Sequence, residues 1–190
     1  MGMKPYQHEY KVMGLAPYAK RKFAVEVKNI FERYLYNFDG DWKFKKKPKD
    51  NYFTFKKLLE GYRFDNIASG LQLYLESRLL EWFEYFIKRN KNTKNIVFSG
   101  GLSMNVKANM LISQLCKKYK INFYPAPSGD DYSNCISAGY IETKKAAQKL
   151  TEFAKPNIIK NLYLGYEFTK IDEEKVVQWS KKNGFRVYLK

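Results

Sequence analysis

The stretch Ile96-Val97-Phe98-Ser99-Gly100-Gly101-Leu102-Ser103-Met104-Asn105 decides the fold. Its first three residues are apolar and predict the end of a buried strand, and the two glycines predict a tight turn. Asn105 is expected on the first turn of a helix that runs to about Lys118. Glycine lets the backbone approach a ligand closely, and a helix N-terminus favours an anion. The stretch therefore indicates a turn that faces a phosphate or nucleotide, or alternatively a plain turn whose glycines only relieve crowding.

The neighbouring segments continue this alternation of helix and strand. An apolar stripe over Phe64–Asn90, with Asp65 as its expected N-cap, predicts a long helix before the strand. Ile121–Tyr124 predicts a second strand, and residues 133–150 predict a further helix. This order is typical of an α/β fold in which the two strands are parallel.

Two short clusters carry candidate functional side chains. Asp130 and Asp131 follow the second strand, where two carboxylates can hold a hard metal or cap the next helix. His8, Glu9 and Lys11 lie within four residues and can present an acid, a base and a cation to one anionic ligand. A surface histidine and a solvated ion pair are the plainer interpretation of the second cluster. The first 18 residues show no helical or strand period.

The segments on either side of this region predict further elements. Apolar spacing predicts a helix over Arg21–Tyr36, and alternation predicts a short strand over Trp42–Phe44. The basic loop Lys45–Lys49 is either a polyanion patch or a solvated loop. Toward the C-terminus we expect these elements: a linker over 151–160, a strand over 161–165, a helix over 172–182 and a strand over 185–189.

Composition narrows the functional classes. The 190 residues carry a formal charge of +16, which comes mostly from lysine. Arginine is the side chain best suited to bind phosphates and bases, and the sequence contains only six. We therefore do not expect nucleic acid as a partner. No apolar run reaches the roughly 20 residues of a membrane span, and no signal segment opens the chain, so we expect a cytoplasmic protein without a membrane partner. The two cysteines suit a reducing compartment, with Cys116 in a helix core and Cys135 a small buried filler.

Three motifs now stand in order along the chain. They are Glu9-Tyr10-Lys11-Val12-Met13-Gly14-Leu15-Ala16-Pro17-Tyr18, Phe98-Ser99-Gly100-Gly101-Leu102-Ser103-Met104-Asn105 and Ser128-Gly129-Asp130-Asp131. Together they resemble the O-carbamoyltransferases of the nodulation-factor, cephalosporin and tobramycin type. Asn66–Gln72 also looks like the family's helix before the glycine turn, and Leu162–Phe168 resembles the start of its C-terminal domain.

This resemblance implies a fold and an activity. It implies that residues 1–150 are the second half of an actin/hexokinase-like ATPase-fold domain, similar to the tRNA threonylcarbamoyl transferase subunit. Residues 161–190 would begin a small α+β domain that joins carbamoyl phosphate and ATP into carbamoyl-adenylate. The first domain would then pass the carbamoyl group to a hydroxyl of a sugar or natural product. Partners are therefore expected to be carbamoyl phosphate, ATP and a hydroxyl-bearing glycan or small-molecule acceptor.

The resemblance also implies site residues and cofactors. Gly100, Gly101 and Asn105 would lie against the adenylate, and Glu9 and Lys11 would approach the same ligand. Asp130 would bind a divalent metal, iron in this family, together with two histidines in a His-x-x-x-His arrangement, and Mg²⁺ would accompany ATP. No general base can be named.

The sequence departs from the family at the metal site. It contains one histidine, so the histidine pair is expected upstream of Met1, and the chain is interpreted as an internal piece that is inactive alone. Two alternatives stay open: a non-catalytic nucleotide-binding module of the same fold, and a basic nucleic-acid-binding protein. A tRNA-modifying relative is a further possibility, although the Ala16-Pro17-Tyr18 string favours the small-molecule branch.

Overall fold

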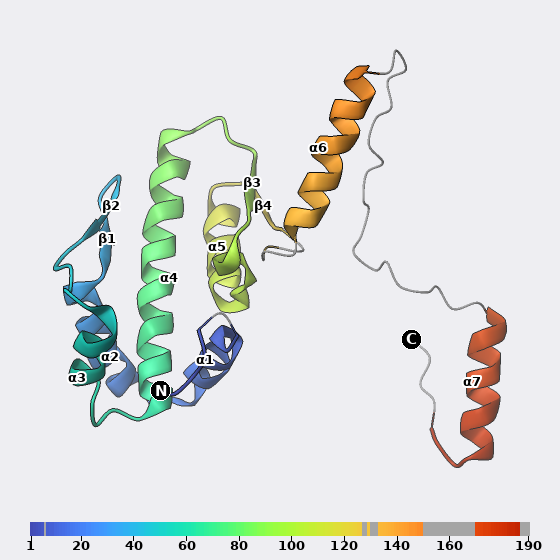
Figure 1. Ribbon diagram of the computed structural model, residues 1–190, viewed down its shortest axis with the longest axis horizontal. Helices are drawn as coiled ribbons and strands as arrows, with labels where there is room; N and C mark the ends of the chain where they lie inside the picture. The colour runs from blue at the N-terminus through green and yellow to red at the C-terminus, as the bar shows by residue number, and fades with distance from the viewer. Residues whose placement is uncertain (6, 127–128, 130–132, 150–169, 187–190) are drawn as a thin grey trace. The chain divides into compact units, whose positions relative to one another are not determined.

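A computed structural model describes residues 1–5, 7–126, 129, 133–149 and 170–186. The chain divides into two compact units, Met1–Gly139 and Tyr140–Lys190. The elements of unit 1 are α1 (Glu9–Leu15), η1 (Ala16–Tyr18), α2 (Arg21–Tyr34), β1 (Tyr36–Phe38), β2 (Trp42–Phe44), α3 (Asn51–Leu58), α4 (Phe64–Arg89), β3 (Asn95–Phe98), η2 (Gly101–Met104), α5 (Val106–Lys118), β4 (Asn122–Pro125) and the start of α6 (Ser133–Lys149) (Figure 1).

The predicted pair of parallel strands is confirmed. β3 pairs with β4 in register, from Asn95 opposite Asn122 to Phe98 opposite Pro125. α5 connects the two strands, so β3, α5 and β4 form one βαβ unit in which both strands end at the same edge. The two segments that follow these strand ends carry the second and third sequence motifs.

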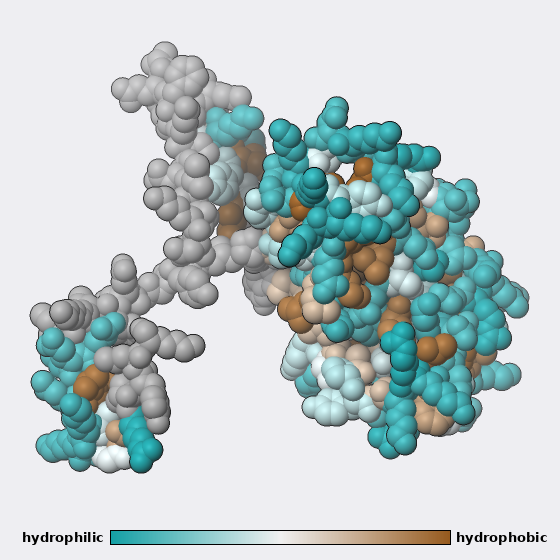
Figure 2. Space-filling view, turned by 180° about the vertical axis from the view of Figure 1, so that it is seen from behind, coloured by the Kyte–Doolittle hydropathy of each residue, from teal (hydrophilic) through white to brown (hydrophobic). Residues whose placement is uncertain are grey.

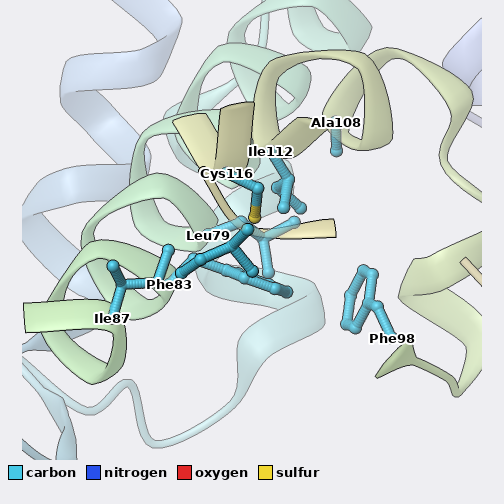
Figure 3. Close-up of a cluster of buried hydrophobic side chains, with 8 residues drawn as sticks. Leu79, Phe83, Ile87, Phe98, Ala108, Ile112 and Cys116 are labelled. Carbon is cyan, nitrogen blue, oxygen red and sulfur yellow. The ribbon is translucent and has the colours of Figure 1, made fainter. Parts of the chain in front are cut away.

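One hydrophobic core of unit 1 lies between the sheet formed by β3 and β4 and the helices α4 and α5. Figure 3 shows its side chains converging: Leu79, Phe83 and Ile87 from α4, Phe98 from β3, and Ala108, Ile112 and Cys116 from α5. The Phe83 and Phe98 rings meet edge to face at 5.2 Å between centroids. Cys116 is fully buried here, as predicted.

The prediction that the strand before the glycine turn is buried is only partly right. Phe98 points into the core, but Val97 is 70% exposed. Successive side chains of a strand point to opposite faces, so Val97 lies on the face of the sheet turned away from α4 and α5.

α4 is the central element of unit 1 and contacts α1, η1, α2, β1 and α5. It crosses α2 at Gly70. A Cβ added to Gly70 would lie 2.5 Å from Val27 Cγ1 and 2.9 Å from the backbone nitrogen of Lys28. The absent side chain therefore allows the two helices to approach, and Val27, Phe31 and Tyr74 form a second core cluster beside this crossing.

Two expectations for local structure in unit 1 were wrong. The first 18 residues contain α1 and η1, because these short helices pack on α4 and do not depend on an apolar stripe of their own. Asp65 does not cap α4, since Arg63 occupies the N-cap position and Asp65 lies inside the first turn. The predicted strand Trp42–Phe44 is confirmed as β2, which forms a hairpin with β1 across the Gly40 turn.

Both predicted helices of the C-terminal part are confirmed, as α6 and as α7 (Lys170–Lys182). α7 ends in a Schellman motif. The backbone nitrogen of Phe185 donates to the carbonyl oxygen of Ser180, and Gly184 has a φ of 76°. Cys135 is exposed on α6, so the prediction that it is buried was wrong. The predicted linker over 151–160, the strand over 161–165 and most of the strand over 185–189 lie outside the described residues.

Figure 2 shows charged and polar side chains over most of the visible face, with apolar atoms between them. Among the residues that the structure describes, no helix is long and apolar enough to cross a membrane.

Candidate functional site

The turn after β3 leaves its backbone open to the surroundings. Gly100 has φ 100° and ψ 168°, a conformation that is essentially restricted to glycine. A Cβ added to Gly100 or Gly101 would meet no atom within 4 Å. The backbone conformation therefore requires glycine at Gly100. At Gly101 neither the conformation nor the surrounding packing requires it, and the space above this turn is accessible to a ligand.

Asn105 anchors the end of this turn to α4. Its Oδ1 accepts from the backbone nitrogen of Ala108 at 3.0 Å, so Asn105 caps α5 and does not lie in its first turn. Its side-chain amide also pairs with that of Gln72: Asn105 Nδ2 donates to Gln72 Oε1 at 2.8 Å, and Gln72 Nε2 donates back to Asn105 Oδ1 at 3.0 Å. Gln72 donates its second hydrogen to Glu76 Oε1 at 2.9 Å. Gln72 thus ties the turn to α4, and Glu76 fixes the Gln72 side chain in turn.

Gly129, after β4, lies directly against this turn. A Cβ on Gly129 would collide with Ser103 Oγ and lie 3.2 Å from the carbonyl oxygen of Gly100. Ser103 is 3% exposed, and its Oγ has no hydrogen-bond partner in the described part of the chain. Gly129, the one described residue of the third motif, therefore meets the second motif beyond the end of β3. Sequence reasoning missed Ser103, because a serine in a turn carries no distinguishing signal.

The proposed metal ligand, Asp130, lies outside the described residues. Among those described, no group of three or more histidine, cysteine, aspartate or glutamate side chains is placed to hold a metal ion. The metal site remains a prediction.

The first motif forms α1 and η1, which pack on the same helix, α4, that holds the glycine turn. Glu9 and Lys11 are both exposed, but residues two apart on a helix point in different directions. His8 precedes α1, and its Nδ1 accepts from the backbone nitrogen of Lys4 at 3.1 Å. The structure therefore does not gather these three side chains into one cluster.

The end of the first motif borders an open hollow at the start of α4. The residues lining it are Leu15, Tyr18, Tyr62, Arg63, Phe64 and Asp65. Arg63 donates to Asp65 twice, from Nε at 3.2 Å and from Nη2 at 2.9 Å, and this hydrogen bonding lowers the pKa of the Asp65 carboxyl group. Asp65 therefore stays ionised beside the hollow, where its charge is paired with that of Arg63.

Comparison with protein families identifies the chain. The family described as Carbamoyltransferase N-terminus matches residues 1–139. The chain belongs to this carbamoyltransferase family. Comparisons with curated proteins and with solved structures gave no match.

The match covers the glycine turn, Gly129, α1 and all of α4, and it ends at the residue where unit 1 ends. These elements are therefore parts of a carbamoyltransferase N-terminal domain with mixed helices and strands, and the general activity of the family is carbamoyl transfer. The domain division that the sequence suggested, at residue 150, stays a prediction.

Proposed function

We propose that this carbamoyltransferase is an O-carbamoyltransferase whose glycine turn binds carbamoyl-adenylate. In this proposal carbamoyl phosphate and ATP, with Mg²⁺, form the adenylate, and its carbamoyl group passes to a hydroxyl of a sugar or natural product. The observation that carries the proposal is the open turn at Gly100 and Gly101, held rigid by the amide pair of Gln72 and Asn105. The proposal places the protein in the cytoplasm, where ATP is available.

The location of the turn supports an adenylate ligand. Ligands of α/β proteins bind beyond the carboxyl ends of parallel strands, and both β3 and β4 end here. The first turn of α5 adds the partial positive charge of a helix N-terminus, which favours a phosphate. A turn without side chains lets a nucleotide approach backbone N–H groups directly. We further propose that the βαβ unit belongs to an actin/hexokinase-like ATPase fold.

The remaining site residues have distinct roles in this proposal. Gly100 and Gly101 would contact the ligand, and Asn105 would position the turn because its polar atoms already cap α5 and pair with Gln72. Lys11 would offset phosphate charge, with Glu9 nearby on the same helix.

Asp130 remains the proposed ligand of a divalent metal such as iron. A set of two histidines and one aspartate does not fit the residues present, since the sequence contains one histidine and His8 Nδ1 already accepts a backbone hydrogen bond. We therefore derive no catalytic step through this metal.

The proposal is tested by measuring which ligands the chain binds. Calorimetric titration should show micromolar or tighter binding of a non-hydrolysable sulfamoyl analogue of carbamoyl-adenylate, and weaker binding of AMP. Equal affinity for the analogue and AMP would favour the alternative, a non-catalytic nucleotide-binding module. Tight binding of single-stranded DNA with a steep salt dependence, and none of the analogue, would favour a nucleic-acid-binding protein.

A further inference from the structure

A second surface of unit 1 is remote in sequence from the glycine turn and carries a concentrated positive charge. Between Lys43 and Lys57 the chain has seven lysines and one acidic residue, Asp50. We define the hairpin–helix patch as the five lysines from Lys43 to Lys49, Lys56 and Lys57, and the aromatic pair Tyr52 and Phe53. All of these side chains are exposed.

The patch has a fixed framework. Its basic loop begins at Lys45, whose backbone nitrogen donates to the carbonyl oxygen of Leu35 at the end of α2. The loop ends at α3, where the Asp50 carboxylate caps the helix by accepting from the backbone nitrogen of Phe53 at 2.7 Å. Phe55 fixes α3 to the second core, with its ring 5.4 Å from that of Phe31. Asp50, the only acid in this segment, is thus engaged in capping.

The aromatic pair projects from this framework. Tyr52 is 66% exposed and Phe53 is 69% exposed, and their rings meet edge to face at 5.1 Å. Neither side chain belongs to the core clusters described above. Within the described part of the chain, none of the patch lysines forms an ion pair. Two large aromatic side chains therefore project from a segment whose lysines have no acidic partner among the described residues, and the Lys56 ammonium lies 5.8 Å from the centre of the Tyr52 ring.

From this arrangement we propose that the hairpin–helix patch docks the protein on an anionic membrane surface. Clusters of four to eight lysines are attracted to acidic lipid headgroups, and aromatic side chains insert at the boundary between headgroups and acyl chains. This proposal departs from the expectation of no membrane partner, because that expectation rested on the absence of a membrane span, and peripheral contact needs none. The proposal is independent of the function proposed for the glycine turn.

The same features favour lipid over nucleic acid. The patch contains no arginine, the side chain best suited to bidentate contact with phosphates and bases. Tyr52 and Phe53 pack edge to face, and this arrangement does not offer parallel ring faces on which successive bases could stack.

The test is vesicle flotation with the full chain. One set of vesicles is phosphatidylcholine alone, and the other is equal parts phosphatidylcholine and phosphatidylglycerol. We expect binding to the second set only, weakening as salt is added. Each lysine near an acidic surface contributes about 1 kcal/mol, so the triple variant Lys45→Gln, Lys46→Gln, Lys47→Gln should bind about 100-fold more weakly.

Two further variants separate the proposal from a general charge effect. The double variant Tyr52→Ala, Phe53→Ala should lose about tenfold in affinity without a change in net charge. The matched control Lys22→Gln, Lys91→Gln, Lys94→Gln removes the same charge from exposed positions outside the patch and should retain most of the binding. The proposal is overturned by absence of binding to the anionic vesicles, by equal losses in both lysine triples, or by single-stranded DNA displacing the chain from vesicles at equimolar phosphate.

Discussion

The side-chain amides of Gln72 and Asn105, which are 33 residues apart in the sequence, donate a hydrogen bond to one another at 3.0 and 2.8 Å. The pair joins the first half of α4 to the N-cap residue of α5. Because Asn105 Oδ1 also accepts from Ala108, one side chain both starts a helix and fixes the turn before it. The rigidity of the proposed ligand site depends on this contact.

Substitutions of Asn105 should separate its two roles. Asn105→Ser retains a helix cap but cannot pair with Gln72, whereas Asn105→Ala loses both interactions. We expect Asn105→Ala to lower the free energy of unfolding by about 1 kcal/mol more than Asn105→Ser does. Urea denaturation of both variants checks this order. Equal stabilities would show that the cap contributes nothing.

The contact between Gly129 and Ser103 predicts a rescue. Gly129→Ala should destabilise the chain by roughly 1–3 kcal/mol, because its Cβ collides with Ser103 Oγ. Ser103→Ala should be close to neutral, since the hydroxyl it removes is buried and has no partner among the residues that the structure describes. The double variant should recover most of the loss, because the Ser103 Cβ lies 3.4 Å from the added atom. Thermal melts of the wild type, the two single variants and the double variant measure these stabilities. If the stability changes of the two single variants simply add in the double variant, the contact is ruled out.

The crossing of α2 and α4 predicts that Gly70 cannot be enlarged. Gly70→Ala should destabilise by about 1–3 kcal/mol even though alanine favours helix, because the new Cβ meets Val27 and the backbone of Lys28. Gly14→Ala is the matched control, since a Cβ there meets nothing within 4 Å. It should be neutral or stabilising by up to about 1 kcal/mol. A stable Gly70→Ala variant would mean that the helices cross elsewhere.

Tyr74 predicts a loss of stability at alkaline pH. Burial raises the pKa of Tyr74 from 10.0 to about 12, while its hydroxyl donates to the Tyr36 carbonyl at 2.6 Å. A raised pKa favours the protonated native state, so this contribution is complete below about pH 10 and is lost as the pH rises toward about 12. The full shift corresponds to roughly 2–3 kcal/mol. The stability difference between wild type and Tyr74→Phe should therefore shrink over this range, and a constant difference would contradict the assignment.

Sequence periodicity was sufficient to predict the elements with a strong apolar stripe or β-branched run. The elements α4, α5 and the parallel pair β3 and β4 were all predicted. The helix α2 was predicted to run to Tyr36, but it ends at Tyr34, and Tyr36 begins β1, where it pairs with Phe44. α1 could not be predicted, since its helix depends on contact with α4. Asp65 was placed as a cap because local sequence does not show that Arg63 takes that position.

The structure confirms the turn at Gly100 and Gly101, whereas the ligand assigned to it stays a prediction. The turn itself was predictable, because paired glycines after an apolar strand have a local signature. The pairing of Asn105 with Gln72 and the approach of Gly129 to Ser103 depend on packing between distant segments. No local pattern encodes such contacts, so they emerged only from the structure.

The most direct test of the central claim, that the glycine turn binds carbamoyl-adenylate, is the affinity of Gly101→Val for the sulfamoyl analogue, measured by calorimetry beside Gly139→Ala. A Cβ atom added at either glycine would meet no other atom within 4 Å, so both variants should fold. The account predicts that Gly101→Val binds at least about tenfold more weakly, a loss of about 1.4 kcal/mol, while Gly139→Ala matches wild type. Unchanged affinity in a folded Gly101→Val protein would contradict the claim.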